Sequence, residues 1–148
     1  MPLFRDRDGD GFGSALEAEQ AFGCPTPGWV TVGGDCGDGV ATPFNPVDLA
    51  YPGQTGFFFV GYTANQGGLS FDFDCSGAEE ADDTNLPFEA APDCDLGSAC
   101  GTSGFRLEER PGTGVDSRCG SEIIVSCAPT GPRCRADEAP TSEPYRCR

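Results

Sequence analysis

Short apolar runs separated by turn residues set the pattern of this chain, and the clearest of them predicts a β-hairpin. Residues 57–63 are rich in aromatic and β-branched residues, and residues 69–73 alternate apolar with polar side chains. The sequence Asn-Gln-Gly-Gly at residues 65–68 is typical of a tight turn. The two runs are therefore expected to pair as neighbouring strands.

The other apolar runs are shorter and predict elements on both sides of this hairpin. Before it, the apolar stretch that follows Gly28 predicts a short strand, and residues 15–22 have the length of one or two helical turns. After it, three strands are predicted at 105–107, 122–126 and 145–147. An acidic, proline-interrupted stretch at 83–92 is the expected boundary of a last module. The chain thus divides into an acidic loop repeat (1–50), a hairpin with a second acidic loop (51–90) and a cysteine-rich β module (91–148).

Cysteine, glycine and proline decide the class of fold. The 148 residues include 22 Gly, 13 Pro and 9 Cys, which is typical of a loop-rich chain that needs covalent cross-links to be stable. So many cysteines in a short chain indicate an oxidising compartment. We expect a small, mainly β, loop-rich, disulfide-stapled fold with little helix in a secreted or cell-surface protein. Its export signal would have been removed or would lie outside this sequence.

Charge is distributed unevenly along the chain. Residues 1–100 contain 17 Asp or Glu and 2 Arg, a net charge of −15, whereas residues 101–148 contain 7 of each sign and are neutral. A strongly acidic surface repels nucleic acid and anionic lipid and attracts cations. The longest compact apolar stretch covers only residues 57–60, so neither nucleic-acid binding nor membrane insertion is expected.

The first acidic residues have the spacing of a calcium-binding loop. Three aspartates occupy alternate positions from residue 6 and a glycine follows at once, which gives the start of a D-x-D-x-D-G loop. A backbone carbonyl at position 7 and a glutamate at position 12 complete it. The predicted ligands are Asp6, Asp8, Asp10, the Phe12 carbonyl and Glu17. The fold is therefore expected to be calcium-stabilised.

Two arginines offer an alternative to a cation in this loop. Arg5 and Arg7 could neutralise the aspartates, but exposed ion pairs contribute only about 0–1 kcal/mol. Three carboxylates about 4 Å apart repel by roughly 1 kcal/mol per pair even in bulk water, and a divalent ion removes this repulsion more fully. Too few residues precede Asp6 for the entering helix of an EF-hand, so another element must hold the loop.

Cys24 and Cys36 bracket a turn and a short apolar strand, so we expect them to close a small covalent loop that contributes about 3 kcal/mol. Asp35 and Asp38 flank Cys36, and this bridge would bring both carboxylates to the first loop, where they compete with Glu17 for the last ligand places. Seven cysteines then remain, one of them unpaired, with their connectivity open. We expect Cys75 to bond to the C-terminal module.

A second acidic loop follows the hairpin. Residues 72–83 repeat part of the calcium-loop spacing, with Gly77 at the turn position and a serine at one ligand position. The alternative is that Glu79, Asp82 and Asp83 form a solvated acidic surface. The predicted ligands of this second calcium site are Asp72, Asp74, Ser76, the Ala78 carbonyl, Glu80 and Asp83.

The order of these motifs resembles a known family. Asp-x-Asp-Gly-Asp-Gly-Phe-Gly from residue 6, Cys-x-x-Pro-Gly from residue 24, Gly-Gly-Asp-Cys-x-Asp from residue 33 and then Asn45-Pro46 resemble the metal-binding-motif repeat of secreted and surface proteins that is common in myxobacteria. The stretch is also similar to thrombospondin type 3 calcium repeats. The resemblance implies calcium loops over residues 6 to about 50 and continues more weakly into residues 51–80. Gly37 stands where the family usually has Asp, so one expected ligand is missing.

Catalysis is not expected. His and Lys are absent, which removes the usual nucleophile–base pairs, zincin motifs and Schiff-base chemistry. Cysteine pairs of the C-x2-C type are absent too, so a structural zinc site is not predicted. Only a carboxylate pair of the kind used in glycoside hydrolysis remains. We predict that the chain is not an enzyme.

The sequence therefore predicts an extracellular calcium-binding structural or adhesive module with Ca²⁺ as its cofactor. One alternative is a subunit of a self-assembling surface fibre or filament, a homo-oligomer that joins through an exposed edge strand such as residues 57–60. Another is a carbohydrate-binding or glycan-active protein with glycan or extracellular-matrix partners, in which Trp29 and residues 57–60 form an aromatic face. Core packing explains the same aromatic residues more simply.

Overall fold

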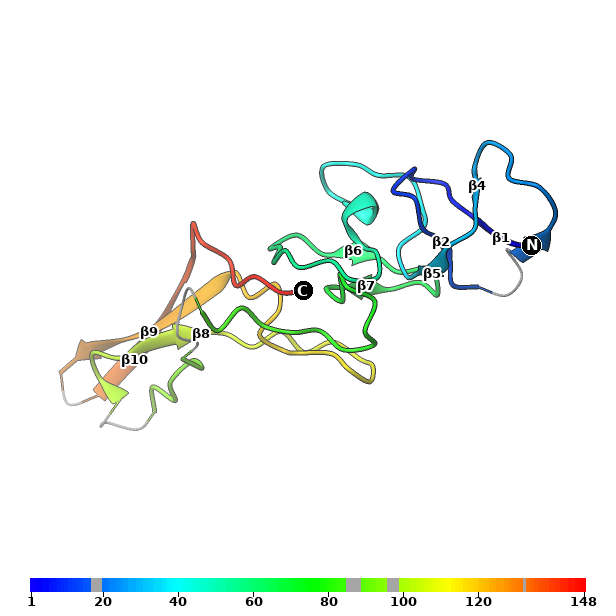
Figure 1. Cartoon of the computed structure of the whole chain (residues 1–148). Coiled ribbons are helices and arrows are strands. Elements are labelled where there is room, and N and C mark those ends of the chain that lie inside the picture. Colours follow the sequence, from blue (N-terminus) through cyan, green and yellow to red (C-terminus); the bar gives the residue numbers. More distant parts are fainter. Residues whose placement is uncertain (17–19, 85–88, 96–98, 132) are drawn as a thin grey trace.

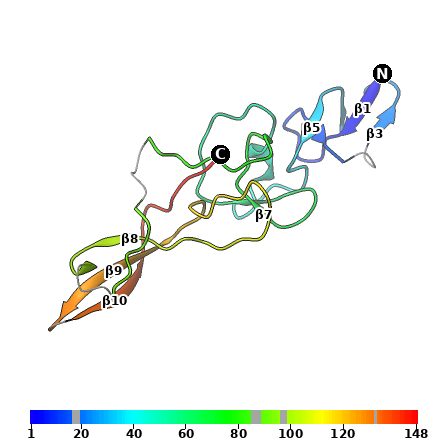
Figure 2. The ribbon, with the colours of Figure 1, turned by 90° about the horizontal axis from the view of Figure 1, so that it is seen from below.

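The computed structural model describes residues 1–16, 20–84, 89–95, 99–131 and 133–148 as an elongated, loop-rich β protein (Figure 1). The N-terminus lies at one end, a long hairpin of strands β9 and β10 lies at the other, and the C-terminus returns to the middle in both views (Figures 1 and 2). Strands of two to eight residues, a 3₁₀ turn at Val47–Leu49 (η2) and four disulfides organise the described residues. The predicted class of fold, small, mainly β and disulfide-stapled, is confirmed.

The N-terminal part contains two small sheets. Strand β1 (Pro2–Arg5) lies between β3 (Gln20–Phe22) and β4 (Trp29–Val30), antiparallel to both. Strand β2 (Gly13–Ser14) pairs in parallel with β5 (Gly33–Asp35). The helical turns predicted over 15–22 are wrong at their end, because Gln20–Phe22 pairs with β1; residues 17–19 lie outside the described residues.

Two glycines allow these small sheets to pack tightly. A Cβ atom at Gly13 would lie 2.4 Å from the Phe4 Cβ atom, and one at Gly33 would lie 2.6 Å from the Phe4 ring. Strands β2 and β5 can therefore lie against β1 only because neither residue carries a side chain at that contact.

The predicted hairpin is present in a shorter form. Strand β6 (Tyr62–Thr63) pairs with β7 (Leu69–Ser70), and Tyr62 lies opposite Ser70. The residues before β6 contribute side chains to the core instead of extending the strand: the Phe58 ring lies 4.5 Å from the ring of Phe73. Phe58 also forms a β-bridge with Cys147.

One hydrophobic core joins the middle of the chain to its C-terminal end. Tyr62, Phe73 and Tyr145 are almost fully buried in it. The C-terminal residues run back between two earlier segments, because Cys147 bridges both Phe58 and Ala81. The buried members of this core are Val47, Ala50, Tyr62, Phe71, Phe73, Cys119, Tyr145 and Cys147.

The cysteine-rich module is built on a three-stranded antiparallel sheet in the order β10-β9-β8. Its strands are β8 (Ser103–Phe105), β9 (Ile123–Thr130) and β10 (Arg133–Pro140). The first two lie near the predicted strands at 105–107 and 122–126. β10 was not predicted, because its highly charged sequence is exposed along almost its whole length and does not alternate with apolar residues.

The disulfide map corrects two expectations. Cys36 bonds to Cys75 and Cys24 is free and exposed, so the predicted Cys24–Cys36 bridge is wrong. The reason is that Cys24 follows the edge strand β3 at the surface, whereas Cys36 follows β5 and packs against the core. Cys75 therefore does not bond to the C-terminal module. The remaining pairs are Cys94–Cys127, Cys100–Cys134 and Cys119–Cys147.

No helix among the described residues is long or apolar enough to cross a membrane.

Candidate metal centre

Hydrogen bonds from backbone to aspartate side chains fold the first acidic loop. The Gly9 N–H donates to Asp6 Oδ1 at 2.7 Å, and the Phe12 N–H donates to Asp10 Oδ1 at 2.8 Å. Gly9 and Gly11 have φ angles of +84° and +95°, a left-handed conformation that glycine adopts without strain. The sequence placed the sharp turn at Gly11, and the structure confirms it.

The parallel pairing of β2 with β5 brings a second acidic segment to this loop. Asp35, at the end of β5, is completely buried, and its Oδ1 atom accepts from the Gly37 N–H at 2.8 Å. Asp38 is also buried, and its Oδ1 atom accepts from the Arg7 N–H at 2.5 Å. The loop is thus held by a neighbouring segment of the chain in place of the helix pair of an EF-hand.

The carboxylates of the two segments form two groups that share Asp8 and could each hold a metal ion. One oxygen from each of Asp6, Asp8 and Asp10 falls within 4.8 Å of the others, and the same is true of Asp8, Asp35 and Asp38. Asp8 belongs to both groups and therefore links the first loop to the segment at residues 35–38. Five of the predicted first-site ligands are brought together in this way.

Three carboxylate oxygens in the cluster are buried without a hydrogen bond. The Oδ2 atoms of Asp8, Asp10 and Asp35 are inaccessible to solvent and have no hydrogen-bond partner among the described residues. Burying such an atom costs about 1–3 kcal/mol, and more when it is charged. Each of these aspartates uses Oδ1 to hold the backbone and has Oδ2 left over, as a cation ligand requires.

The pKa values of the cluster reflect this burial. Burial, reinforced by the repulsion of neighbouring carboxylates, raises the pKa of Asp8 to about 6 and that of Asp35 to about 7. Burial raises the pKa of Asp10 as well, and Asp6, Asp38 and Asp48 add to the effect. Without a cation, the folded protein would therefore hold some of these groups protonated near neutral pH.

We expect the thermal unfolding midpoint of the metal-free protein to fall as the pH rises from about 4 to about 7. Because the pKa of Asp35 is raised from 3.8 to about 7 and that of Asp8 to about 6, the folded chain binds more protons than the unfolded chain over this range. The stability from these groups is complete below pH 3.8 and is lost as the pH rises through their folded pKa values.

Calcium is expected to reverse this trend, since a cation binds the ionised carboxylates and its stabilisation grows with pH. Calorimetry across the same pH range, with and without calcium, measures both slopes. The Asp35→Asn variant serves as the control and should flatten the metal-free slope. A metal-free midpoint that rises with pH over this range would contradict the assignment.

Other first-loop residues take different roles. The Phe12 ring stacks on Tyr51 at 5.4 Å between centroids, which fixes this part of the loop, and its carbonyl as a ligand stays a prediction. Glu17 lies outside the described residues. The Arg5 guanidinium lies over the Trp29 ring at 5.6 Å, so Arg5 and Trp29 are engaged with one another.

Gly37 supplies no ligand because there is no room for a side chain. A Cβ atom at this buried position would lie 2.9 Å from both the Ala50 Cβ atom and the Tyr62 ring. Close packing of the backbone on the core therefore explains why glycine stands at this position.

Asn65 is a site residue that its sequence context indicates only as a turn former. Its Oδ1 atom accepts from the Asp38 N–H at 2.7 Å, and its Nδ2 atom donates to the Asp35 carbonyl at 2.9 Å. It thereby ties the turn between β6 and β7 to the acidic segment. Its position in the predicted turn is the only sequence signal, and it does not indicate contact with a segment about 30 residues earlier.

The second acidic loop is organised differently. Gly77, with φ of +92°, forms the predicted turn, and Asp72 accepts from the N–H groups of Ser76 and Gly77 at 2.9 and 2.8 Å. The Ser76 hydroxyl donates to the Ala78 carbonyl at 3.1 Å. Burial raises the pKa of Asp72. These residues form a closed hydrogen-bonded turn around the Asp72 carboxylate.

The other predicted ligands of the second site form ion pairs. Glu80 pairs with Arg148, whose Nε atom also lies 3.4 Å from Asp74, and Asp83 pairs with Arg118 at 2.8 Å. Among the described residues, the second loop contributes no group of three acidic ligands. The structure thus brings Asp72, Asp74, Ser76 and Ala78 into one turn and directs Glu80 and Asp83 to arginines.

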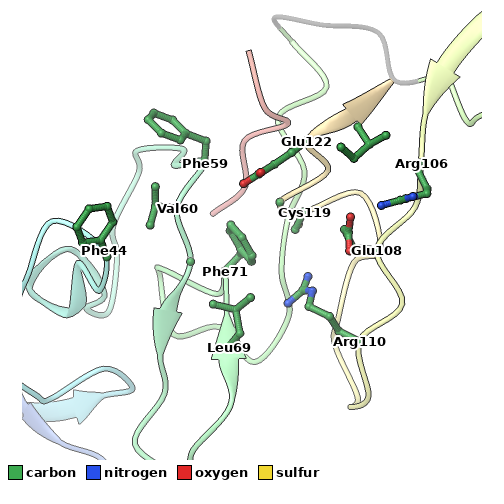
Figure 3. A pocket seen from close by; sticks show the side chains of 13 residues that line it. Phe44, Phe59, Val60, Leu69, Phe71, Arg106, Glu108, Arg110, Cys119 and Glu122 are labelled. Carbon is green, nitrogen blue, oxygen red and sulfur yellow. The ribbon is translucent and has the colours of Figure 1, made fainter. Parts of the chain in front are cut away.

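A groove of about 530 Å³ lies between the hairpin and the C-terminal module. Figure 3 shows an apolar side and a charged side of this groove. The apolar side has Phe44, Phe59 and Val60, and the charged side has Arg106, Glu108 and Arg110. Both arginines are engaged, Arg106 with Glu138 and Arg110 with Glu79. An apolar wall facing a charged one fits many ligand classes and specifies none.

Comparison with known protein families, curated proteins and solved structures finds no match. Fold and site define the class on their own: a disulfide-stapled, loop-rich β protein with a buried cluster of aspartates on adjoining segments. Its resemblance to the metal-binding-motif repeats stays a prediction.

Proposed function

We propose that this chain is an extracellular calcium-binding structural module without catalytic activity. The observation that carries the proposal is the set of buried Oδ2 atoms of Asp8, Asp10 and Asp35, which have no hydrogen-bond partner among the described residues and belong to two carboxylate groups that share Asp8. Divalent cation binding at these groups would give the Oδ2 atoms the partner that they lack. The same geometry supports membership of the metal-binding-motif repeat class.

The ligand chemistry favours calcium over other metals. All side-chain ligands are carboxylates, the hard oxygen donors that Ca²⁺ and Mg²⁺ prefer. Mg²⁺ demands a near-ideal octahedron and keeps most of its water, whereas Ca²⁺ accepts six to eight oxygens in irregular arrangements. Two loop segments crowded with aspartates fit the second description. The cysteines near the cluster, Cys36 and Cys75, form a disulfide and are not available to a softer metal.

A cation at this place would have a mechanical role. It would join the loop at residues 6–12 to the segment at residues 35–38, and Asn65 connects that segment to the hairpin. Three segments that otherwise meet through very short strands would then be locked together. Four disulfides and the absence of a membrane-spanning helix among the described residues are compatible with an extracellular location, where calcium is abundant.

Calcium is expected to raise the thermal unfolding midpoint of the oxidised protein by about 4–10 °C at 10 mM. The reason is that a ligand that binds only the folded chain, with Kd of about 10⁻⁴ to 10⁻³ M as in extracellular modules, adds about 1.4–2.7 kcal/mol at that concentration. Equal magnesium should give a much smaller shift. Scanning calorimetry in chelator, calcium and magnesium measures these midpoints.

Matched variants locate the effect. Asp35→Asn keeps the shape of a fully buried ligand and should abolish most of the calcium shift, and Asp8→Asn should do the same. Asp95→Asn changes an exposed aspartate far along the sequence and should leave the shift intact. A protein with no calcium-dependent shift, or one whose shift survives Asp35→Asn, would rule out this site.

A further inference from the structure

The outer edge of strand β10 is the longest strand edge without a partner among the described residues. β10 runs for eight residues, pairs with β9 on one side, and no described strand lies on the other. The β9–β10 hairpin projects at the end of the molecule opposite the N-terminus (Figures 1 and 2). Such an edge presents free N–H and C=O groups that can accept another strand.

The alternation of backbone hydrogen bonds along β9 shows which backbone groups of β10 have no partner in β9. The Cys127 N–H donates to the Thr102 carbonyl, and the Cys127 carbonyl accepts from the Gly101 N–H, so Cys127 faces β8. Its neighbours Ser126 and Ala128 face β10, where they lie opposite Asp137 and Arg135. The polar backbone groups that point away from β9 are therefore those of Cys134, Ala136 and Glu138.

Charged side chains stand along this edge in a self-complementary order. Arg135 and Asp137 lie on one face of the sheet, with side chains 74% and 54% exposed. The opposite face carries Cys134, which is bonded to Cys100. An ion pair of 3.3 Å joins Arg135 to Asp137 within the strand, but an exposed pair of this kind is worth little and both groups stay available to a partner.

We propose that β10 pairs antiparallel with β10 of a second copy of this chain, with the two-fold axis at Ala136. Residues opposite one another in an antiparallel pair lie on the same face of the sheet. A two-fold axis perpendicular to the sheet places one residue of β10 opposite the same residue of the second copy, so the possible registers differ by shifts of two residues along the strand. With Ala136 opposite itself, Arg135 lies opposite Asp137 of the second copy on both sides of the axis. In the two neighbouring registers Arg135 lies opposite Arg135 or Asp137 lies opposite Asp137, so each contains a like-charge pair. The first of them also places Arg133 opposite Asp137, but only the register centred on Ala136 has complementary pairs without a like-charge pair.

The distribution of net charge permits this contact. Residues 101–148 are neutral, whereas the charge of −15 lies in residues 1–100. The hairpin is at the end of the molecule remote from the first acidic loop (Figure 1), and charges separated by more than about 10 Å are largely screened at 0.1 M salt. Pairing through β10 would form one continuous six-stranded sheet from the two three-stranded sheets.

The test is sedimentation equilibrium of the full oxidised chain in calcium, from about 10 μM to about 1 mM, because a single strand contact is small and the dimer should be weak. We expect a monomer–dimer equilibrium. Arg135→Asp places like charges opposite one another twice and should raise Kd about tenfold or more. The exchange Arg135→Asp with Asp137→Arg restores both pairs and should return Kd to within about threefold of the original.

Arg133→Asp is the matched control. It makes the same change of charge on the same strand, but Arg133 lies opposite Ala139 of the second copy in the proposed register, so Kd should change little. A chain that stays monomeric throughout the range would overturn the proposal. So would a dimer that tolerates Arg135→Asp, or one that the charge exchange fails to restore.

Discussion

Replacing Glu79 by glutamine is expected to lower the free energy of unfolding by about 3 kcal/mol or more, because it breaks a buried ion pair. The Glu79 side chain is only 4% exposed and pairs with Arg110, itself 14% exposed. Its Oε1 atom accepts from the Phe71 N–H at 3.0 Å, and its Oε2 atom accepts from the Asp116 N–H at 2.9 Å. Both oxygens also accept from the Arg110 guanidinium.

The size of this effect follows from what the substitution leaves behind. Glutamine has nearly the same shape, so no cavity forms, but it removes the negative charge and turns one acceptor into a donor beside two other donors. The Arg110 guanidinium, which lies over the Phe71 ring at 5.0 Å, then remains buried without its counter-ion. Breaking a buried ion pair by removing one partner typically costs about 3–5 kcal/mol.

Urea unfolding of the oxidised protein measures this loss, and Glu80→Gln is its control. Glu80 is the next residue in the chain and pairs with Arg148, but its side chain is 49% exposed, so its loss should be about 1 kcal/mol or less. Equal losses of unfolding free energy for the two variants would show that the buried pair stabilises the fold no more than the exposed pair does.

Glu79 also shows where the sequence was insufficient. Glu79, Asp82 and Asp83 have the spacing of a solvated acidic surface, yet Glu79 and Asp82 are buried. Their arginine partners Arg110 and Arg146 follow 31 and 64 residues later, and no local pattern reports such a distant pairing. Burial of a charged residue depends on the tertiary fold, which the spacing of like residues does not encode.

Local signals were sufficient where the structure is local. The Asn-Gln-Gly-Gly turn predicted the β6–β7 hairpin, and the spacing of Asp6, Asp8 and Asp10 predicted a loop that turns at Gly11 and brings these side chains together. The approach of Asp35 and Asp38 to the first acidic loop was also expected, although through a Cys24–Cys36 bridge that is absent. It results from β2–β5 pairing, a contact between strands of two and three residues that carry no recognisable strand pattern.

Removing the Cys36–Cys75 bridge is expected to lower the free energy of unfolding by about 4 kcal/mol in the chain-entropy model. The two cysteines are 39 residues apart, so the bridge restricts a long loop of the unfolded chain. Cys36 also lies between Asp35 and Asp38, and Cys75 follows Asp74 directly. The double variant Cys36→Ala/Cys75→Ala should therefore weaken the proposed calcium site as well as the fold.

The Cys100–Cys134 bridge provides a control that separates these two effects. Its cysteines are 34 residues apart, so its chain-entropy term is almost the same, but both cysteines belong to the C-terminal module. Cys100→Ala/Cys134→Ala should lose about as much stability and keep the full calcium-dependent rise in the unfolding midpoint. Cys24→Ala, which removes the free cysteine, should change neither quantity.

The calcium response decides between a bridge that shapes the metal site and one that only stabilises the chain. If Asp35 and Asp38 are held in place by the bond to Cys75, the calcium shift of Cys36→Ala/Cys75→Ala should fall to a small fraction of that of the Cys100→Ala/Cys134→Ala protein. Equal shifts would mean that β2–β5 pairing and the Asn65 hydrogen bonds alone position the carboxylates. Urea unfolding, followed with and without calcium for both double variants, distinguishes these outcomes because each variant is compared with itself.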